Sequence, residues 1–200
     1  MTQPRQSVVT PERFATGLTY REYREHIQRN QGKFDYNYDE TRLTDDDARA
    51  FHELVSRPDG PARVLALAED WCPDVFRGLP VMARIAESAG MELRIFSRDQ
   101  NIDIMNEFLH EGKHQSIPVF VFYTRSQRYL AHWTERPALA IEQMHLVNAI
   151  FQGKTAEEAL PEYDRFQQGE VWANWRRETV REIRALLTSV CGQAGARPRG

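Results

Sequence analysis

The sequence has only two cysteines, Cys72 and Cys191, among its 200 residues. Two thiols cannot build a disulfide framework, which predicts a cytoplasmic protein whose thiols stay reduced unless chemistry acts on them. Long hydrophobic runs are lacking too, and residues 1–10 have no stretch typical of a signal peptide. We therefore expect no membrane partner.

Blocks of like charge are also absent. The formal net charge is −3, and acidic and basic residues are interleaved along the chain. This distribution argues against electrostatic binding of DNA or RNA. Glycine-rich phosphate loops and Ser-His-Asp signatures are missing as well. What remains is an ordinary soluble composition, in which 41% hydrophobic residues are sufficient for a core.

Apolar periodicity predicts alternating helices and strands from residue 44 onward. The expected helices are 44–55, 73–90, 99–112 and 137–153, and the expected strands are 63–68, 91–97, 116–124 and 127–133. This order indicates an α/β fold with one parallel strand pair and a terminal antiparallel hairpin. We predict the core at 44–152, a helical extension at 1–43, a second one at 153–190 and a disordered tail at 191–200.

The two extensions differ in their patterns. Residues 11–30 are predicted to be helical, and the aromatic, polar segment 31–40 is predicted to be a turn. The last helix carries a single stripe of residues, which is typical of a core face and otherwise of a partner surface: Trp172, Trp175, Thr179, Ile183, Leu186 and Val190.

Three features of the core occur together. Trp71-Cys72-Pro73-Asp74 follows a buried strand, Pro80 lies eight residues after Cys72, and Ile117-Pro118 opens the next-to-last strand. This combination resembles the thioredoxin superfamily, over about residues 44–152. The segments AEDWCPD, SIPVFVF and WTERP are closer still to a bacterial branch of thioredoxin-like proteins, whose usual motif is Trp-Cys-x-x-Cys.

The resemblance implies a thioredoxin-like fold and a site around Cys72. It implies that Cys72 is the nucleophilic thiol and that the Ile117-Pro118 bond is cis and lies beside it. Trp71, Pro73 and Asp74 would then help to form a groove for an extended peptide or a small thiol. The same Trp71 is alternatively an ordinary core tryptophan.

The sequence departs from the family pattern at two positions. Val75 replaces the second cysteine, and Leu65-Ala66-Leu67 replaces the stretch that carries the buried acid of thioredoxins. In a dithiol reductase the second thiol breaks the mixed disulfide, and the acid helps to deprotonate that thiol. Both losses affect the same half of the reaction, so an external thiol would have to complete it.

Opposing effects act on the reactivity of Cys72. The start of a helix stabilises a thiolate by at most about 2 kcal/mol, whereas each nearby carboxylate opposes it by about 1 kcal/mol. The carboxylates are Glu69, Asp70 and Asp74. We predict an exposed sulfur with a modestly lowered pKa; the alternative is an inert thiol packed beneath Trp71.

Two other residues are candidates for roles near the groove. Arg136 would bind a carboxylate of a small thiol, or else form a surface ion pair. Cys191 would resolve a mixed disulfide only if the last helix ended at the active site.

The segment His110-Glu111-Gly112-Lys113-His114 matches the zinc-protease pattern H-E-x-x-H. Such a site needs both histidines on one continuous helix and a third ligand. Gly112 falls where the helix should stop, so we predict no metal site here.

Two hypotheses of different classes follow. In the first, the chain is a monothiol thioredoxin-like protein that exchanges disulfides through Cys72, with a protein thiol or a low-molecular-weight thiol as partner and no other cofactor. In the second, it is a non-catalytic binding or scaffold protein whose redox site has lapsed, and the helix with Trp172 and Trp175 is its contact surface. That helix would also be the contact if the chain forms a homo-oligomer.

Overall fold

The computed structural model describes residues 7–194, with side chains described as far as residue 192. Its centre is a four-stranded sheet made of β1 (Arg63–Ala68), β2 (Glu92–Ser97), β3 (Val119–Tyr123) and β4 (Tyr129–Thr134), in the order β2-β1-β3-β4. Strands β1 and β2 are parallel, and the β1–β3 and β3–β4 pairs are antiparallel. The α/β fold and its mixed sheet are confirmed.

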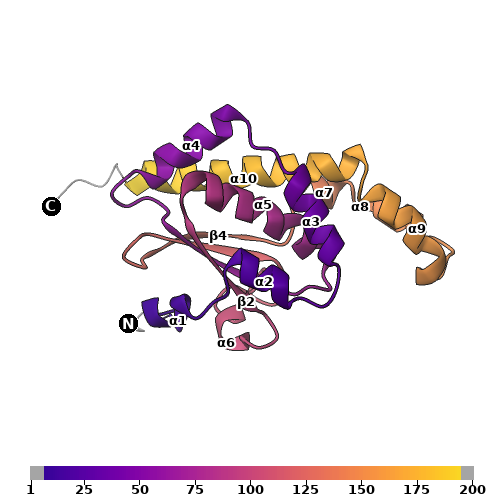
Figure 1. The fold of residues 1–200 in the computed structure, drawn as a ribbon, viewed down its shortest axis with the longest axis horizontal. Coiled ribbons are helices and arrows are strands. Elements are labelled where there is room, and N and C mark those ends of the chain that lie inside the picture. Colours follow the sequence, from indigo (N-terminus) through magenta and orange to yellow (C-terminus); the bar gives the residue numbers. More distant parts are fainter. Residues whose placement is uncertain (1–6, 195–200) are drawn as a thin grey trace.

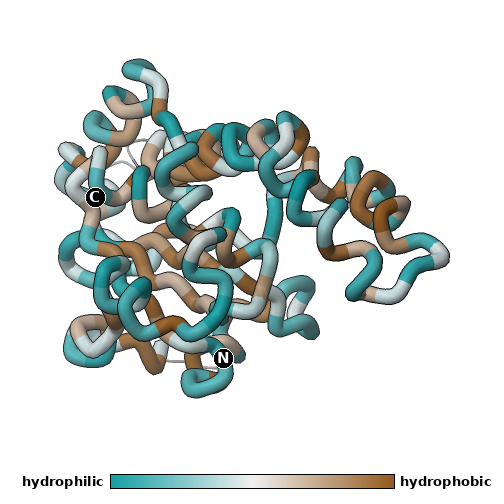
Figure 2. Tube along the Cα trace, turned by 45° about the vertical axis from the view of Figure 1, so that its right-hand side comes forward, coloured by the Kyte–Doolittle hydropathy of each residue, from teal (hydrophilic) through white to brown (hydrophobic). Residues whose placement is uncertain are grey.

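Helices cover both faces of this sheet (Figure 1). On one face α5 (Pro73–Ala89) packs against β1 and β2, while α4 (Asp45–Val55) and α10 (Glu170–Ala194) pack against α5. On the other face lie α1 (Pro11–Ala15) and the short α6 (Ile102–Met105), while α2 (Tyr20–His26) lies along the edge strand β2 on the α5 side. Figure 2 shows hydrophobic residues concentrated in the strands between these layers.

Local signals in the sequence explain the ends of several elements. Thr44 caps α4, because its hydroxyl accepts a hydrogen bond from the Asp47 amide. Gly90 ends α5 in the left-handed conformation, with φ of 72°, which glycine adopts without a steric penalty. Pro80 lies inside α5, as predicted. Residues 63–68 form a buried strand because nearly every side chain is apolar.

The N-terminal extension differs from its prediction. Residues 11–30 form two helices, because Leu18 leaves the helical path and pairs with Ile95 at the edge of β2. The segment predicted as a turn is α3 (Gln31–Glu40). It folds as a helix because Phe34 is fully buried and α3 packs on α5, so tertiary packing overrides a weak local preference.

Two core helices are also shorter than predicted. The segment 99–112 forms only α6, followed by turns. The segment 137–153 divides into α7 (Ala138–Glu142) and α8 (Met144–Phe151) at Gln143. Helix α8 packs on α9 (Ala156–Phe166), and the two project away from the sheet (Figure 1).

Helix α10 belongs to the core of the chain. Trp172, Trp175, Thr179 and Ile183 are all buried. Leu186 and Val190, the other two residues of the predicted stripe, are half-buried, so the stripe is mainly a core face. Helix α10 continues to Ala194, past the predicted end at residue 190, and the rest of the predicted tail lies outside the described residues. Within 7–194, no helix is both long and apolar enough to span a membrane.

Candidate functional site

Cys72 lies where β1 passes into α5. It is the N-cap residue of α5, and Pro73 follows at the first helical position, where the missing amide hydrogen costs nothing. The backbone amides of Val75 and Phe76 both donate to the Cys72 carbonyl, at 3.1 Å each. The thiol is thus held at the amino end of a 17-residue helix.

The loop before β3 reaches this thiol. The Ile117-Pro118 bond is cis, as the resemblance implies. The Cys72 Sγ lies 3.7 Å from the Ile117 carbonyl oxygen, to which the thiol donates a hydrogen bond. A Cβ on Gly78 would come within 3.3 Å of the Pro118 ring, so the absence of a side chain there lets α5 approach the loop. The structure therefore brings Cys72, Ile117 and Pro118 together.

The thiol is less accessible than predicted. Cys72 is only 8% exposed, so the prediction of an exposed sulfur is wrong. Burial raises the pKa of the thiol above its ordinary value, and the charge of Asp74 raises it further. The amides of Val75 and Asp74 and the Arg136 guanidinium act in the opposite direction on this pKa. The predicted lowering of this pKa is also wrong, because desolvation of the buried thiol outweighs the groups that lower it.

Each of the three carboxylates near Cys72 has partners from elsewhere in the chain. Glu69 accepts hydrogen bonds from the Ser97 hydroxyl at 2.7 Å and from the Asp99 amide at 2.9 Å. Asp70 accepts from the backbone amides of Gln28 and Arg29, at 2.9 and 3.0 Å. The N-terminal extension therefore packs directly on the turn that carries Cys72.

Asp74 forms the centre of a largely buried ion-pair network. Its two carboxylate oxygens pair with Arg77 at 2.7 Å and with Arg136 at 2.8 Å. Arg136 also pairs with Glu135 at 2.5 Å. Arg136 thus forms an internal ion pair, and a ligand carboxylate would have to compete with two side chains of the chain itself.

Arg77 is a site residue that sequence reasoning missed. It is fully buried, and its guanidinium lies over the rings of Trp172 and Trp175, at 5.2 and 5.6 Å from their centres. The Asp74–Arg77 spacing of three residues in the first turns of a helix is the available signal. Through Arg77, the Cys72 helix is joined to α10.

Trp71 is 43% exposed, which excludes the interpretation as a core tryptophan. The Arg98 guanidinium lies over its ring, 5.2 Å from the centre. Arg98 in turn donates to the Gln115 carbonyl at 3.2 Å, in the loop that leads to Pro118. Trp71 therefore stands at the surface beside the cis-proline loop, a position that suits a groove wall.

The positions of the missing thioredoxin groups are filled by packed apolar side chains. Val75 is fully buried, as are Leu65, Ala66 and Leu67. Cys191 lies near Arg57 and Arg128, whose charges lower its pKa against the larger effect of burial. Because Arg128 is in the β3–β4 turn, Cys191 is at the end of β3 opposite Pro118.

The H-E-x-x-H segment is not helical. His110 and His114 pair through their backbones around Gly112, which has a φ of 71°. Within residues 7–194, no group of three or more His, Cys, Asp or Glu side chains is arranged to hold a metal ion.

Comparisons with known proteins address the fold and the family. A crystal structure of a protein of unknown function from Pseudomonas aeruginosa matches with a TM-score of 0.63 and 17% identity, over 88% of this chain and 95% of that one. An HIV epitope-scaffold matches with a TM-score of 0.61 and 18% identity, over the same shares. At such identities the likeness shows the fold alone. No curated protein matches the sequence.

The family follows from a separate comparison. A family model described as thioredoxin matches residues 17–157, which is more than half of the chain. The match includes the Cys72 turn, the cis-proline loop and most of the N-terminal helices that pack on them. The chain therefore belongs to this thioredoxin family.

Proposed function

We propose that the chain is a monothiol thioredoxin-like protein, from the bacterial branch whose usual motif is Trp-Cys-x-x-Cys, and that it exchanges disulfides through Cys72. The main support is the 3.7 Å separation between Cys72 Sγ and the Ile117 oxygen, at a cis-proline and at the start of a helix. Disulfide exchange here needs a nucleophilic thiol, a helix start that stabilises its thiolate and a loop whose backbone can bind the substrate.

The reaction takes place in two balanced steps. The Cys72 thiol loses its proton, and the thiolate attacks one sulfur of a substrate disulfide; a Cys72 mixed disulfide forms while the second substrate sulfur leaves as a thiolate. An external thiolate then attacks the sulfur of the bound partner. Its disulfide with that partner is released, and the Cys72 thiolate takes up a proton again.

The resting thiol is protonated and therefore slow to react. Burial raises its pKa, and the hydrogen bond to Ile117 is one that only the protonated form can donate. An extended peptide or a tripeptide-like thiol that pairs with the backbone of Ile117 would compete for that carbonyl group. Binding would then break the hydrogen bond between the Cys72 thiol and Ile117, next to the substrate disulfide. Trp71 would form one wall of the groove that holds the substrate.

The test uses the second cysteine as a matched control. Cys191 is also 8% exposed, and burial also raises its pKa. We expect oxidised glutathione to form an adduct on Cys72 and not on Cys191, visible by intact mass and peptide mapping, and free thiol to remove it. The Cys72→Ser variant should form no adduct, and Cys191→Ser should behave as the parent. Equal labelling of both cysteines, or none, contradicts the proposal.

The rival function is a binding or scaffold protein without redox activity. The raised pKa of Cys72 and the exposed Trp71 favour it. A binding module would retain its partner when Cys72 is replaced by serine and lose it when Trp71 is replaced by alanine. Peptide capture by the Cys72→Ser variant without any adduct on the parent would support this rival.

A further inference from the structure

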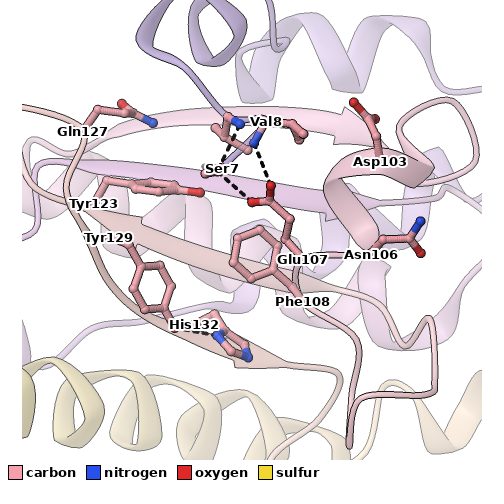
Figure 3. Close-up of a pocket in the computed structure, with 11 residues that line it drawn as sticks. Ser7, Val8, Asp103, Asn106, Glu107, Phe108, Tyr123, Gln127, Tyr129 and His132 are labelled. Carbon is pink, nitrogen blue, oxygen red and sulfur yellow. Dashed lines mark hydrogen bonds between the residues drawn. The ribbon is translucent and has the colours of Figure 1, made fainter. Parts of the chain in front are cut away.

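A second candidate site lies at the far end of β3. A cavity of about 690 Å³ opens there on the sheet face opposite α10 (Figure 3). We call it the distal pocket and define it by Val9, Phe108, Tyr123, Gln127, Tyr129 and His132. Its volume is in the range typical of small-molecule sites. Cys72 and Pro118 are at the opposite end of the strand, so the pocket is separate from the thiol.

Tyr123 presents a buried hydrogen-bond donor to this pocket. The residue is 2% exposed, and within residues 7–194 its hydroxyl has no hydrogen-bond partner. Burial, together with the charge of Glu107, raises the pKa of this hydroxyl, so it keeps its proton. Figure 3 shows the hydroxyl directed into the cavity, toward Glu107 and Ser7. A buried hydroxyl without a partner is costly, and a ligand acceptor would remove that cost.

Gln127 provides a second donor on the same wall. Its side-chain oxygen accepts a hydrogen bond from Arg63 at 2.9 Å. Because arginine only donates, this bond fixes the orientation of the amide. The Gln127 nitrogen is buried, and among the described residues it has no acceptor. Figure 3 shows Gln127 on the same side of the cavity as Tyr123.

The rest of the lining is mainly aromatic. The Phe108 and Tyr129 rings are 22° from parallel with centres 6.3 Å apart, and the Phe108 and His132 rings have centres 5.5 Å apart. Tyr129 remains 47% exposed and Val8, also in the lining, 37% exposed. Such rings suit a flat, apolar body that would cover them.

Charge at the mouth selects against anions. The Glu107 carboxylate accepts hydrogen bonds from the Ser7 hydroxyl at 2.7 Å and from the Val8 amide at 2.6 Å. Asp103 is neutralised by Arg13 at 3.0 Å. Among the residues that the structure describes, Glu107 has no such cation, so an anionic ligand beside it would meet a like charge.

We propose that the distal pocket binds a neutral, flat and largely apolar small molecule that carries a carbonyl oxygen. The oxygen accepts a hydrogen bond from the Tyr123 hydroxyl, with the Gln127 amide as second donor. The apolar body packs against Phe108 and Tyr129. This site is independent of disulfide exchange at Cys72.

A matched set of probes tests the proposal on the full chain. Acetylnaphthalene carries the carbonyl group, ethylnaphthalene lacks it, and naphthoate adds a negative charge to a body of similar shape. We expect acetylnaphthalene to bind most tightly and to perturb the amide NMR signals of residues 7–9, 103–108 and 123–132. Ethylnaphthalene should bind about 2- to 10-fold more weakly, which corresponds to the loss of one hydrogen bond.

Two tyrosine variants locate the donor. Tyr123→Phe should weaken acetylnaphthalene by about the same 2- to 10-fold and leave ethylnaphthalene unchanged. Tyr23→Phe is the control, because Tyr23 also has a buried hydroxyl with no partner among the described residues but does not line this pocket. The proposal is overturned if acetylnaphthalene does not bind, if naphthoate binds as well, if Tyr123→Phe has no effect, or if the perturbed signals surround Cys72.

Discussion

The two ends of β3 have opposite properties. At the Pro118 end there is a buried thiol, Cys72, whose Sγ lies against the Ile117 carbonyl, and the neighbouring carboxylate of Asp74 is paired with two arginines. At the Tyr123 end there is an open cavity with donors that have no partner among the described residues, and no described cysteine lines it. The comparison teaches that the thiol and the open cavity are at opposite ends of one strand, so each end has to be tested for its own function.

The largest effect is expected from restoring a second thiol beside Cys72, at the Pro118 end of β3. In the Val75→Cys variant, a second thiol would stand three residues after Cys72, at a position that is fully buried. We expect the pre-reduced variant to reduce an insulin disulfide in the absence of any external thiol, whereas the parent should stop at the mixed disulfide, because only the variant carries its own resolving thiol.

The control places the new thiol elsewhere on the same helix. Val81 is also fully buried in α5, and Val81→Cys without external thiol should stop at the mixed disulfide like the parent. If Val75→Cys forms its internal disulfide but remains inactive, the fault lies in the surroundings of Cys72, and the proposed groove would lose its support.

The next largest effect concerns the ion pairs behind Cys72. Asp74→Asn leaves Arg77 fully buried without its carboxylate, and removal of one member of a buried pair costs about 3–5 kcal/mol of unfolding free energy. The same change removes a charge that raises the pKa of Cys72, so alkylation of the thiol should become faster. Urea unfolding and iodoacetamide kinetics measure the two effects.

Asp46→Asn is the matched control. Asp46 is also in the first turn of a helix and pairs with an arginine three residues on, Arg49, but both side chains are exposed. Surface pairs of this kind contribute about 0–1 kcal/mol. Equal losses of stability in the two variants would contradict the assignment of Asp74 to a buried network.

A smaller effect on the pKa of Cys72 distinguishes Arg136 from Arg98. Arg136 lowers the pKa of Cys72, so Arg136→Gln should raise that pKa further and slow alkylation at neutral pH. We expect a change of about two- to fivefold, since a partly screened charge contributes on the order of 0.5–1 kcal/mol. The rate of both proteins should rise with pH up to a midpoint above 9.0, the ordinary value for the thiol.

Arg98→Gln is the comparison variant for this measurement. Arg98 lies over Trp71, 5.2 Å from the ring centre, rather than on Asp74. Its replacement should leave the alkylation rate of Cys72 within error. If alkylation is slower in Arg98→Gln than in Arg136→Gln, Arg136 is not the residue whose charge lowers the pKa of Cys72.

Much of the fold was accessible from the sequence because its signals are local. The buried strand 63–68, the Gly90 stop and the Thr44 cap each depend on a few neighbouring residues. Segment 31–40 was not accessible, because it is helical only through the packing of Phe34 on the core and of α3 on α5. Its own residues favour a turn.

Some features of the candidate site could also be predicted from the sequence, and others could not. The cis Ile117-Pro118 bond followed from a resemblance that rests on short motifs. The burial of Cys72 did not, and neither did the partners of Asp70, which come from the backbone of residues 28 and 29, about 40 positions earlier in the chain. The spacing of Asp74 and Arg77 indicates their ion pair, but the packing of Arg77 on α10 and the distal pocket depend on side chains from distant segments, for which the sequence contains no comparable signal.

The smallest expected effect tests whether the two ends are coupled. Burial lowers the pKa of His132 below 6.5, its ordinary value, and its Nδ1 lies 2.7 Å from the Tyr129 hydroxyl. A ligand in the distal pocket would remove more water from the ring and lower the pKa further, because desolvation disfavours the charged imidazolium. By linkage, acetylnaphthalene should bind more weakly as the pH falls through the His132 midpoint.

NMR titration of the His132 ring, with and without acetylnaphthalene, measures this shift. A glutathione adduct on Cys72 should leave the His132 midpoint unchanged, because the adduct is at the other end of the strand. The His132→Asn variant should bind acetylnaphthalene with an affinity that no longer depends on pH in this range. If the adduct instead moves the His132 midpoint as far as the ligand does, the two ends of β3 act as one site, and the separation between chemistry and cavity does not hold.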